Sequence, residues 1–103
     1  MIIVKGPLKL AEGGGLRMMS AIAAMTTATR AEPGCIRYSL TPDNENPDII
    51  QVYEEWTDQK SLAAHLVADH LIDFQLAMRR TRILEADVHI HYPDGTTKRL
   101  INV

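Results

Sequence analysis

His65 is the side chain in this sequence whose type and spacing most clearly suggest chemistry. It lies with Leu62 and Leu66 on a segment with helical spacing, so the three side chains share one helical face. We expect that face, and the imidazole with it, to point into the space between a helix and a sheet. A neutral imidazole there could take a proton from a bound ligand, because histidine has an unperturbed pKa near the working pH. A core histidine hydrogen-bonded to a backbone carbonyl is the alternative.

Glu54 and Trp56 alternate along an apolar segment and share one strand face with Val52. Trp56 could form a pocket wall and stack on a planar substrate, or it could simply pack in the core. An inward-facing carboxylate at Glu54 requires a partner, which Arg37 or a histidine could supply. A structural ion pair or a contact between subunits would also explain this carboxylate.

Other aromatic and imidazole side chains could complete such a pocket. Tyr38 and Tyr53 could each offer a hydroxyl to a ligand oxygen, or each could be a half-buried strand residue with its hydroxyl at the rim. His70 follows Asp69 at a predicted helix start, where it could gate the pocket mouth or be a partly exposed residue of the helix cap. Phe74 is expected in the core or in the pocket wall.

Three further features suggest chemistry more weakly. Asp87, His89 and His91 share a strand face, but a metal site usually needs a fourth ligand, and an exposed or interface face is the simpler interpretation. We therefore expect no metal site. Residues 13–15 are three glycines without a phosphate-loop pattern, which predicts a flexible loop or a lid. Cys35 has no base beside it in the sequence, which argues against a nucleophile.

The elements that must position these side chains follow from local patterns. Alternating apolar residues predict strands, and helical spacing with caps at Asp58 and Asp69 predicts the helices. The order is β-α-β-β-α-β, which is typical of a ferredoxin-like α+β domain with an antiparallel sheet. The predicted strands cover residues 1–10, 35–41, 49–56 and 83–92; the helices cover 16–30, a segment after residue 58, and 71–80. Residues 93–103 form a turn and then a short strand or arm that could contact a partner subunit.

Details of the strands carry further expectations. Pro7 cannot donate a hydrogen bond within a sheet, so it predicts an edge position or a bulge. Ile36 is expected to share a face with Tyr38 and Leu40. The segment 49–53 is apolar on both faces, which predicts burial on both faces and hence a second layer.

Composition excludes several classes of protein. The 103 residues suit one domain, and a net charge of −2 gives no basic excess for nucleic acid or an anionic membrane. The single cysteine excludes an internal disulfide and a cysteine-based zinc site. Neither a signal peptide nor a membrane span is evident, so we expect a cytoplasmic protein.

Two segments resemble a known family. The first covers residues 30–38, with Glu-Pro-Gly-Cys followed by Tyr38; the second is Val-Tyr-Glu-Glu-Trp at 52–56, followed by His65 and His70. Over residues 1–92 the chain resembles the antibiotic biosynthesis monooxygenase domain. The resemblance implies a homodimer in which two sheets pack face to face as an α+β barrel. It also implies oxidation of a phenol or quinol by oxygen without flavin, metal or haem.

On this resemblance we expect His65 to be catalytic and the small aromatic substrate to contact a set of neighbours: Tyr38, Glu54, Trp56, His70 and Phe74. A haem-degrading branch of the family is disfavoured. Its haem-ligating histidine corresponds to Gln75, a distinctive tryptophan corresponds to His65, and its catalytic asparagine has no counterpart in residues 1–10. Two alternatives remain open: a non-catalytic dimer that binds a small aromatic ligand, and isomerase-like proton transfer with His65 as general base.

Overall fold

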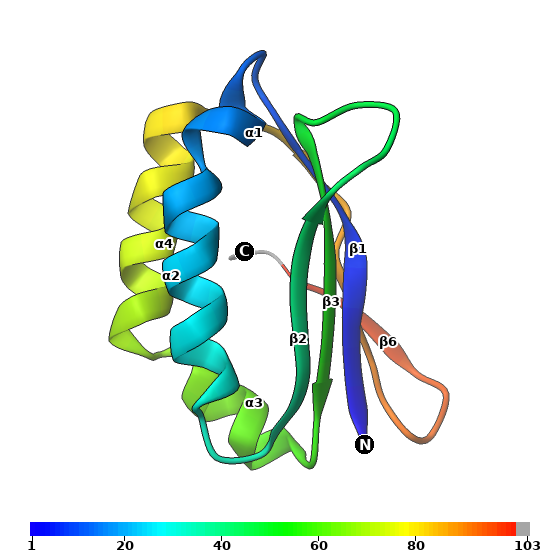
Figure 1. Ribbon diagram of the computed structural model, residues 1–103. Helices are drawn as coiled ribbons and strands as arrows, with labels where there is room; N and C mark the ends of the chain where they lie inside the picture. The colour runs from blue at the N-terminus through cyan, green and yellow to red at the C-terminus, as the bar shows by residue number, and fades with distance from the viewer. Residues whose placement is uncertain (101–103) are drawn as a thin grey trace.

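The sheet and helices form two layers, as a computed structural model that describes residues 1–100 shows. Neighbouring strands follow the order β2-β3-β1-β5-β6, with β4 also beside β1, and every pairing is antiparallel. Helices α2 and α4 lie side by side on one face of this sheet (Figure 1). The result is the ferredoxin-like α+β fold that the sequence predicts. The elements are β1 (Ile2–Leu10), α1 (Gly14–Arg17), α2 (Met19–Arg30), β2 (Cys35–Pro42), β3 (Ile49–Trp56), α3 (Gln59–Leu66), α4 (Asp69–Thr81), β4 (Ile83–Ala86), β5 (His89–His91) and β6 (Thr97–Arg99).

The core lies between the helices and the near face of the sheet. Alternate residues of β3 point into it, so Val52, Glu54 and Trp56 are buried while Gln51 is exposed. Within residues 1–100 no helix covers the opposite face (Figure 1). Ile49 and Tyr53 lie on that opposite face and are only half-buried.

Pro7 lies in the middle of the sheet, so the prediction of an edge position is wrong. The bulge alternative does not hold at Pro7 either, because β1 keeps one register through this residue on both sides and shifts only between Lys9 and Leu10. β1 pairs with β3 on one side and with β4 and β5 on the other. The carbonyl of Pro7 accepts from Asp87 N at 3.0 Å, at the interruption between β4 and β5. A Cβ on the neighbouring Gly6 would lie 2.1 Å from the Asp87 carbonyl oxygen, so this close approach of two backbones requires glycine.

The same interruption corrects the predicted continuous strand over residues 83–92, which is split into β4 and β5. A second irregularity lies between Cys35 and Arg37, where the register of β2 against β3 shifts. Because of this bulge Ile36 is 47% exposed, although it was expected to share the buried face of Tyr38 and Leu40.

The glycine segment 13–15, which caps and begins α1, is fixed rather than a flexible loop or lid. The Asp48 carboxylate accepts from Gly13 N at 3.0 Å and from Gly15 N at 2.9 Å, which ties the loop after β1 to the loop before β3. Gly15 is buried, and a Cβ added to it would lie 1.9 Å from the Pro47 carbonyl oxygen. The segment therefore needs glycine because another backbone packs against it.

Capping differs between the two later helices. Asp58 caps α3 as predicted, since its Oδ1 accepts from Ser61 N at 2.8 Å. The cap of α4 is Ala68, so the prediction of Asp69 as the cap is wrong. Asp69 instead lies in the first helical turn, where a negative charge suits the helix dipole. None of the helices within residues 1–100 is long and apolar enough to cross a membrane.

Candidate active site

His65 lies in the interior, between α3 and the sheet. Its side chain is 2% exposed, and Leu62, one turn earlier, is buried beside it. The Asp58 cap fixes where α3 begins, and helical spacing then directs residues 62 and 65 toward the core. The imidazole is therefore held in a dry environment where its contacts decide its chemistry.

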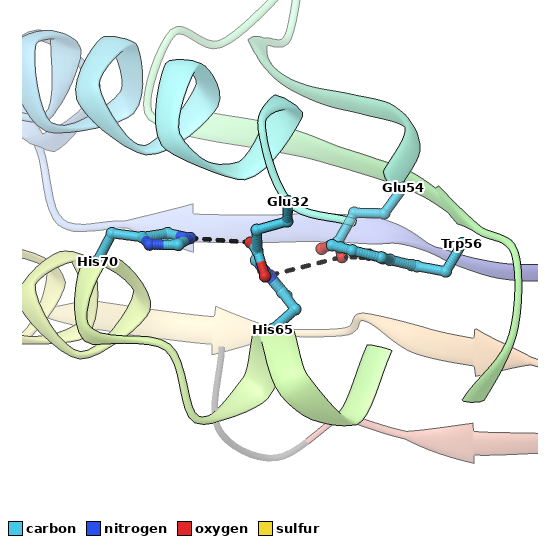
Figure 2. A network of polar contacts seen from close by, with 5 residues as sticks. All are labelled: Glu32, Glu54, Trp56, His65 and His70. Atoms are coloured by element: carbon cyan, nitrogen blue, oxygen red, sulfur yellow. Dashed lines mark hydrogen bonds and ion pairs between the residues drawn. The ribbon is translucent and has the colours of Figure 1, made fainter. Parts of the chain in front are cut away.

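One carboxylate oxygen joins two histidines. Glu32 follows the end of α2, and its Oε2 lies 2.6 Å from His65 Nδ1 and 2.8 Å from His70 Nε2 (Figure 2). An ionised carboxylate only accepts hydrogen bonds, so each of these ring nitrogens carries the proton that it shares with Glu32. A neutral His65 is consequently protonated at Nδ1, which leaves its Nε2 as the basic nitrogen.

The second nitrogen of His65 faces another carboxylate. His65 Nε2 lies 3.8 Å from Glu54 Oε1, and the same oxygen accepts from Trp56 Nε1 at 2.9 Å (Figure 2). Burial raises the pKa of Glu54 to about 7, although the hydrogen bond from Trp56 opposes this shift. Of the two partners predicted for Glu54, the histidine is present. Arg37 is not, because it pairs with Glu55 at 3.5 Å.

Aromatic rings enclose the imidazole on two sides. The ring centroid of Trp56 lies 4.7 Å from that of His65, and the Tyr38 ring meets it edge-on at 5.6 Å. Burial lowers the pKa of His65, while the hydrogen bond that it donates to Glu32 opposes that shift, so the ring is neutral at physiological pH. Burial, and next the charge of Glu54, raise the pKa of Tyr38, so its hydroxyl keeps its proton and can donate it.

A small cavity adjoins this cluster. It has a volume of ≈ 20 Å³, which is room for about one water molecule. Four of the predicted site residues line it: Tyr38, Glu54, His65 and Phe74. Apolar side chains complete the lining, including Leu66 and Leu100.

The structure does not bring Trp56 or His70 to the cavity wall. Trp56 packs against the His65 ring from within the core and is 0% exposed. His70 instead lines a separate groove of ≈ 140 Å³ between α2 and α4, with Asp73 and Phe74. Phe74 borders both spaces. His70 meets the site through its hydrogen bond to Glu32 and through its ring, whose centroid lies 6.1 Å from that of His65.

Comparison with known proteins identifies the family. The sequence profile of the family described as antibiotic biosynthesis monooxygenase matches residues 1–76. The chain belongs to this family. No curated protein matches the sequence at a significant level.

Solved structures of several organisms share the fold. A candidate antibiotic biosynthesis monooxygenase from Nitrosomonas europaea superposes with a TM-score of 0.82 at 17% identity, covering 89% of this chain and 97% of that one. One from Deinococcus radiodurans gives 0.81 at 19% identity, covering 100% and 98%. A conserved protein from Methanosarcina mazei Go1 gives 0.79 at 27% identity, covering 87% and 89%.

The site of this family member includes one residue that sequence reasoning missed. In the sequence Glu32 stands out only as part of the Glu-Pro-Gly-Cys segment, although it makes the shortest polar contact of His65. The signal available is the position of this acidic residue directly after a helix and before a strand. Its histidine partners lie 33 and 38 residues away in sequence, so no local pattern reveals the pairing.

The structure also places the two weaker candidates from the sequence, which are the Asp87, His89 and His91 face and Cys35. His89 and His91 are half-buried on β5 and Asp87 is exposed, and His89 Nδ1 lies 3.6 Å from Asp87 Oδ1. Among residues 1–100, only Glu32, His65 and His70 gather three potential ligand atoms within 4.8 Å of one another.

Burial, and next the charge of Glu32, raise the pKa of Cys35, which makes its thiol a poorer nucleophile.

Proposed function

We propose that this protein oxidises an aromatic phenol or quinol with molecular oxygen, without an organic cofactor, and that His65 Nε2 is the catalytic base. The observation that carries the proposal is the neutral, buried imidazole whose Nδ1 is held by Glu32 at 2.6 Å. A base fixed in this tautomer presents Nε2 to the cavity lined by Tyr38 and Glu54. Membership of the antibiotic biosynthesis monooxygenase family supports this class of reaction.

The first chemical step is proton transfer from the substrate hydroxyl to His65 Nε2. The imidazolium that forms is stabilised by the Glu32 carboxylate at its Nδ1, as a carboxylate stabilises the histidine of a catalytic triad. The Tyr38 hydroxyl can donate to the phenolate oxygen because its own pKa is raised. The electron-rich phenolate is then the species that reacts with oxygen.

The products follow from the balance of atoms and electrons. A quinol that gives both electrons and both protons to oxygen leaves as the quinone with hydrogen peroxide. In a monooxygenation, one oxygen atom enters a substrate methylene carbon as a carbonyl, and the other leaves as water with the two hydrogens. Both outcomes begin with the same proton transfer to His65.

Substrate access requires side chains to move. The cavity of ≈ 20 Å³ holds no aromatic ring, so binding must displace the apolar side chains of its lining. Leu66, Phe74 and Leu100 come from three different segments and can part without breaking the sheet. We place the substrate between them, with its ring toward Phe74 and its hydroxyl toward His65. In this pose Trp56 supports the imidazole, and His70 acts through Glu32.

The proposal includes a homodimer in the cytoplasm. The half-buried Ile49 and Tyr53 on the open face of the sheet support a second layer there, and a second copy of the chain would supply it as a barrel. Residues 1–92 would form the domain and residues 93–103 an arm that contacts the partner; residues 101–103 lie outside the described part of the chain. A light-scattering mass of one chain at micromolar concentration would refute the dimer.

Oxygen uptake with reduced naphthoquinols and anthrone-like phenols tests the reaction. We expect uptake above background with the wild type and its loss in His65→Gln, whereas His89→Gln on β5 is the matched control and should retain it. Turnover that continues without oxygen would instead indicate isomerase-like proton transfer. Saturable stabilisation by these ligands without turnover would indicate a binding protein.

A further inference from the structure

Three side chains from three segments converge on one point beside the proposed substrate cavity. Glu32 comes from the turn after α2, His65 from α3 and His70 from the first turn of α4. The ligand atoms Oε2, Nδ1 and Nε2 all lie within 4.8 Å of one another (Figure 2). The fold thus gathers two imidazoles and one carboxylate that are up to 38 residues apart in the chain.

We propose that Glu32, His65 and His70 form a binding site for a divalent first-row transition-metal ion, such as Zn²⁺, which replaces the two hydrogen bonds between them. Two imidazole nitrogens and a carboxylate oxygen are a ligand set that borderline divalent ions favour over Mg²⁺ or Ca²⁺. Three protein ligands leave at least one coordination position for water.

Small movements would create the coordination geometry. Ligand atoms that bind zinc at about 2.0–2.1 Å lie roughly 3.3 Å apart in a tetrahedron. The present separations of 2.6 and 2.8 Å from Glu32 Oε2 must therefore each lengthen by about half an ångström. Glu32 lies in a turn, and the His70 side chain is 29% exposed, so both can shift while His65 stays in the core.

A carboxylate already lies near the ring nitrogen of His65 that would not bind the metal. Metal binding at Nδ1 moves the proton of the neutral ring to Nε2, and a ligating histidine usually donates that N–H to a carboxylate. Glu54 Oε1 lies 3.8 Å from Nε2 and is itself fixed by Trp56 Nε1 at 2.9 Å. A closure of less than about 1 Å would complete this hydrogen bond.

A route for the ion reaches the cluster from solvent. The groove of ≈ 140 Å³ between α2 and α4 is lined by His70, Asp73 and Ala21. His70 lines this groove and not the substrate cavity, so an ion or a water ligand in the groove can reach one of the three ligands. Asp73 adds a negative charge beside this route, which favours the approach of a cation.

The inference goes beyond the proposed oxidation and does not depend on it. A metal ion on Nδ1 fixes the proton at Nε2, so a metal-bound His65 cannot be the catalytic base. The two states exclude each other, and metal binding can be measured with no substrate present.

The experiment is a titration of tag-free, chelator-treated wild-type protein with Zn²⁺ by calorimetry and with Co²⁺ by visible absorption. We expect one ion per chain and the intense absorption of four-coordinate Co²⁺. His70→Gln should weaken binding at least about tenfold, since it removes a ligand whose side chain is not needed for the core. Glu54→Gln should weaken it about 10- to 100-fold, as does the loss of a carboxylate that accepts a hydrogen bond from a ligating histidine.

His89→Gln is the matched control, because His89 lies beside Asp87 on β5, away from the cluster. It should bind as the wild type does, and circular dichroism should show that every variant is folded. Binding that survives in His70→Gln but is lost in His89→Gln would overturn the proposal, as would the absence of saturable binding to the wild type. Unchanged affinity in Glu54→Gln would remove Glu54 from the site.

Discussion

Replacing Glu32 by alanine removes the oxygen on which two histidine N–H groups converge, and we expect it to destabilise the fold. His65 is 2% exposed, so its Nδ1–H cannot reach water after the truncation. A buried donor without a partner costs about 1–3 kcal/mol. The His70 side chain is 29% exposed and can turn toward water, so the loss of its hydrogen bond to Glu32 costs less free energy. Together these effects should lower the free energy of unfolding by about 2–3 kcal/mol.

The glutamine variant separates charge from geometry. Both hydrogen bonds end on Oε2, so a single amide oxygen at that place can accept from both rings. Glu32→Gln loses only the added strength of a charged acceptor, and we expect a decrease of about 1 kcal/mol in the free energy of unfolding.

Urea unfolding in a buffer with a chelator measures both values. All variants must be compared at one protein concentration, because the apparent stability of an oligomer depends on it. Glu45→Ala, in the exposed loop before β3, is the control and should unfold as the wild type does. An alanine variant within about 0.5 kcal/mol of wild type would refute the bond between Glu32 and His65. A glutamine variant as unstable as the alanine variant would refute the shared oxygen.

Three further predictions concern other parts of the fold. The raised pKa of Glu54, about 7 against 4.5, means that the folded state keeps a proton which the unfolded state loses; stability present below pH 4.5 is therefore lost as the pH rises to about 7. Glu54→Gln should abolish this loss, which is up to about 3 kcal/mol in urea unfolding with a chelator, and parallel pH curves would contradict it. Gly15→Ala should cost about 1–3 kcal/mol in the same assay because its Cβ meets the Pro47 carbonyl at 1.9 Å; wild-type stability would mean that the two loops are not packed together. Hydrogen bonds from Gly15 N and Gly13 N lower the pKa of Asp48 below 3.8, so its stabilisation is complete at neutral pH and is lost as the pH falls below about 3.8. Wild type should thus be more stable than Asp48→Asn at pH 7, and this difference in thermal midpoint should shrink in acid; a constant difference would exclude the role of the charge.

Local patterns in the sequence were sufficient for the parts of the site that lie on regular elements. Strand alternation places Tyr38 and Glu54 on the helix-facing side of the sheet, and helical spacing turns His65 and Phe74 inward to meet them. These periodicities are properties of the strand and helix backbone, so they do not depend on contacts with the rest of the chain.

The positions of the other site residues could not be predicted, because they depend on contacts between segments that are distant in the sequence. Glu32 lies in a turn, where no periodicity sets the direction of a side chain, and its partners belong to α3 and α4. His70 was expected before a helix that begins at residue 71. Because α4 begins at Asp69, His70 lies within the first turn and meets Glu32 rather than the substrate cavity. The pairing of β1 with an interrupted strand is equally non-local, since it depends on how Gly6 approaches Asp87.

The position of one proton on His65 distinguishes the states that the site can adopt. A carboxylate lies near each ring nitrogen, but Glu32 is at 2.6 Å from Nδ1 and Glu54 is at 3.8 Å from Nε2, so the proton of the neutral ring lies on Nδ1. A bound phenol adds a second proton at Nε2, whereas a metal ion on Nδ1 moves the single proton to Nε2. The ¹⁵N chemical shifts of the two ring nitrogens therefore separate the base from the metal ligand without any assay of turnover. A free protein whose Nδ1 is unprotonated would contradict the geometry on which both proposals rest.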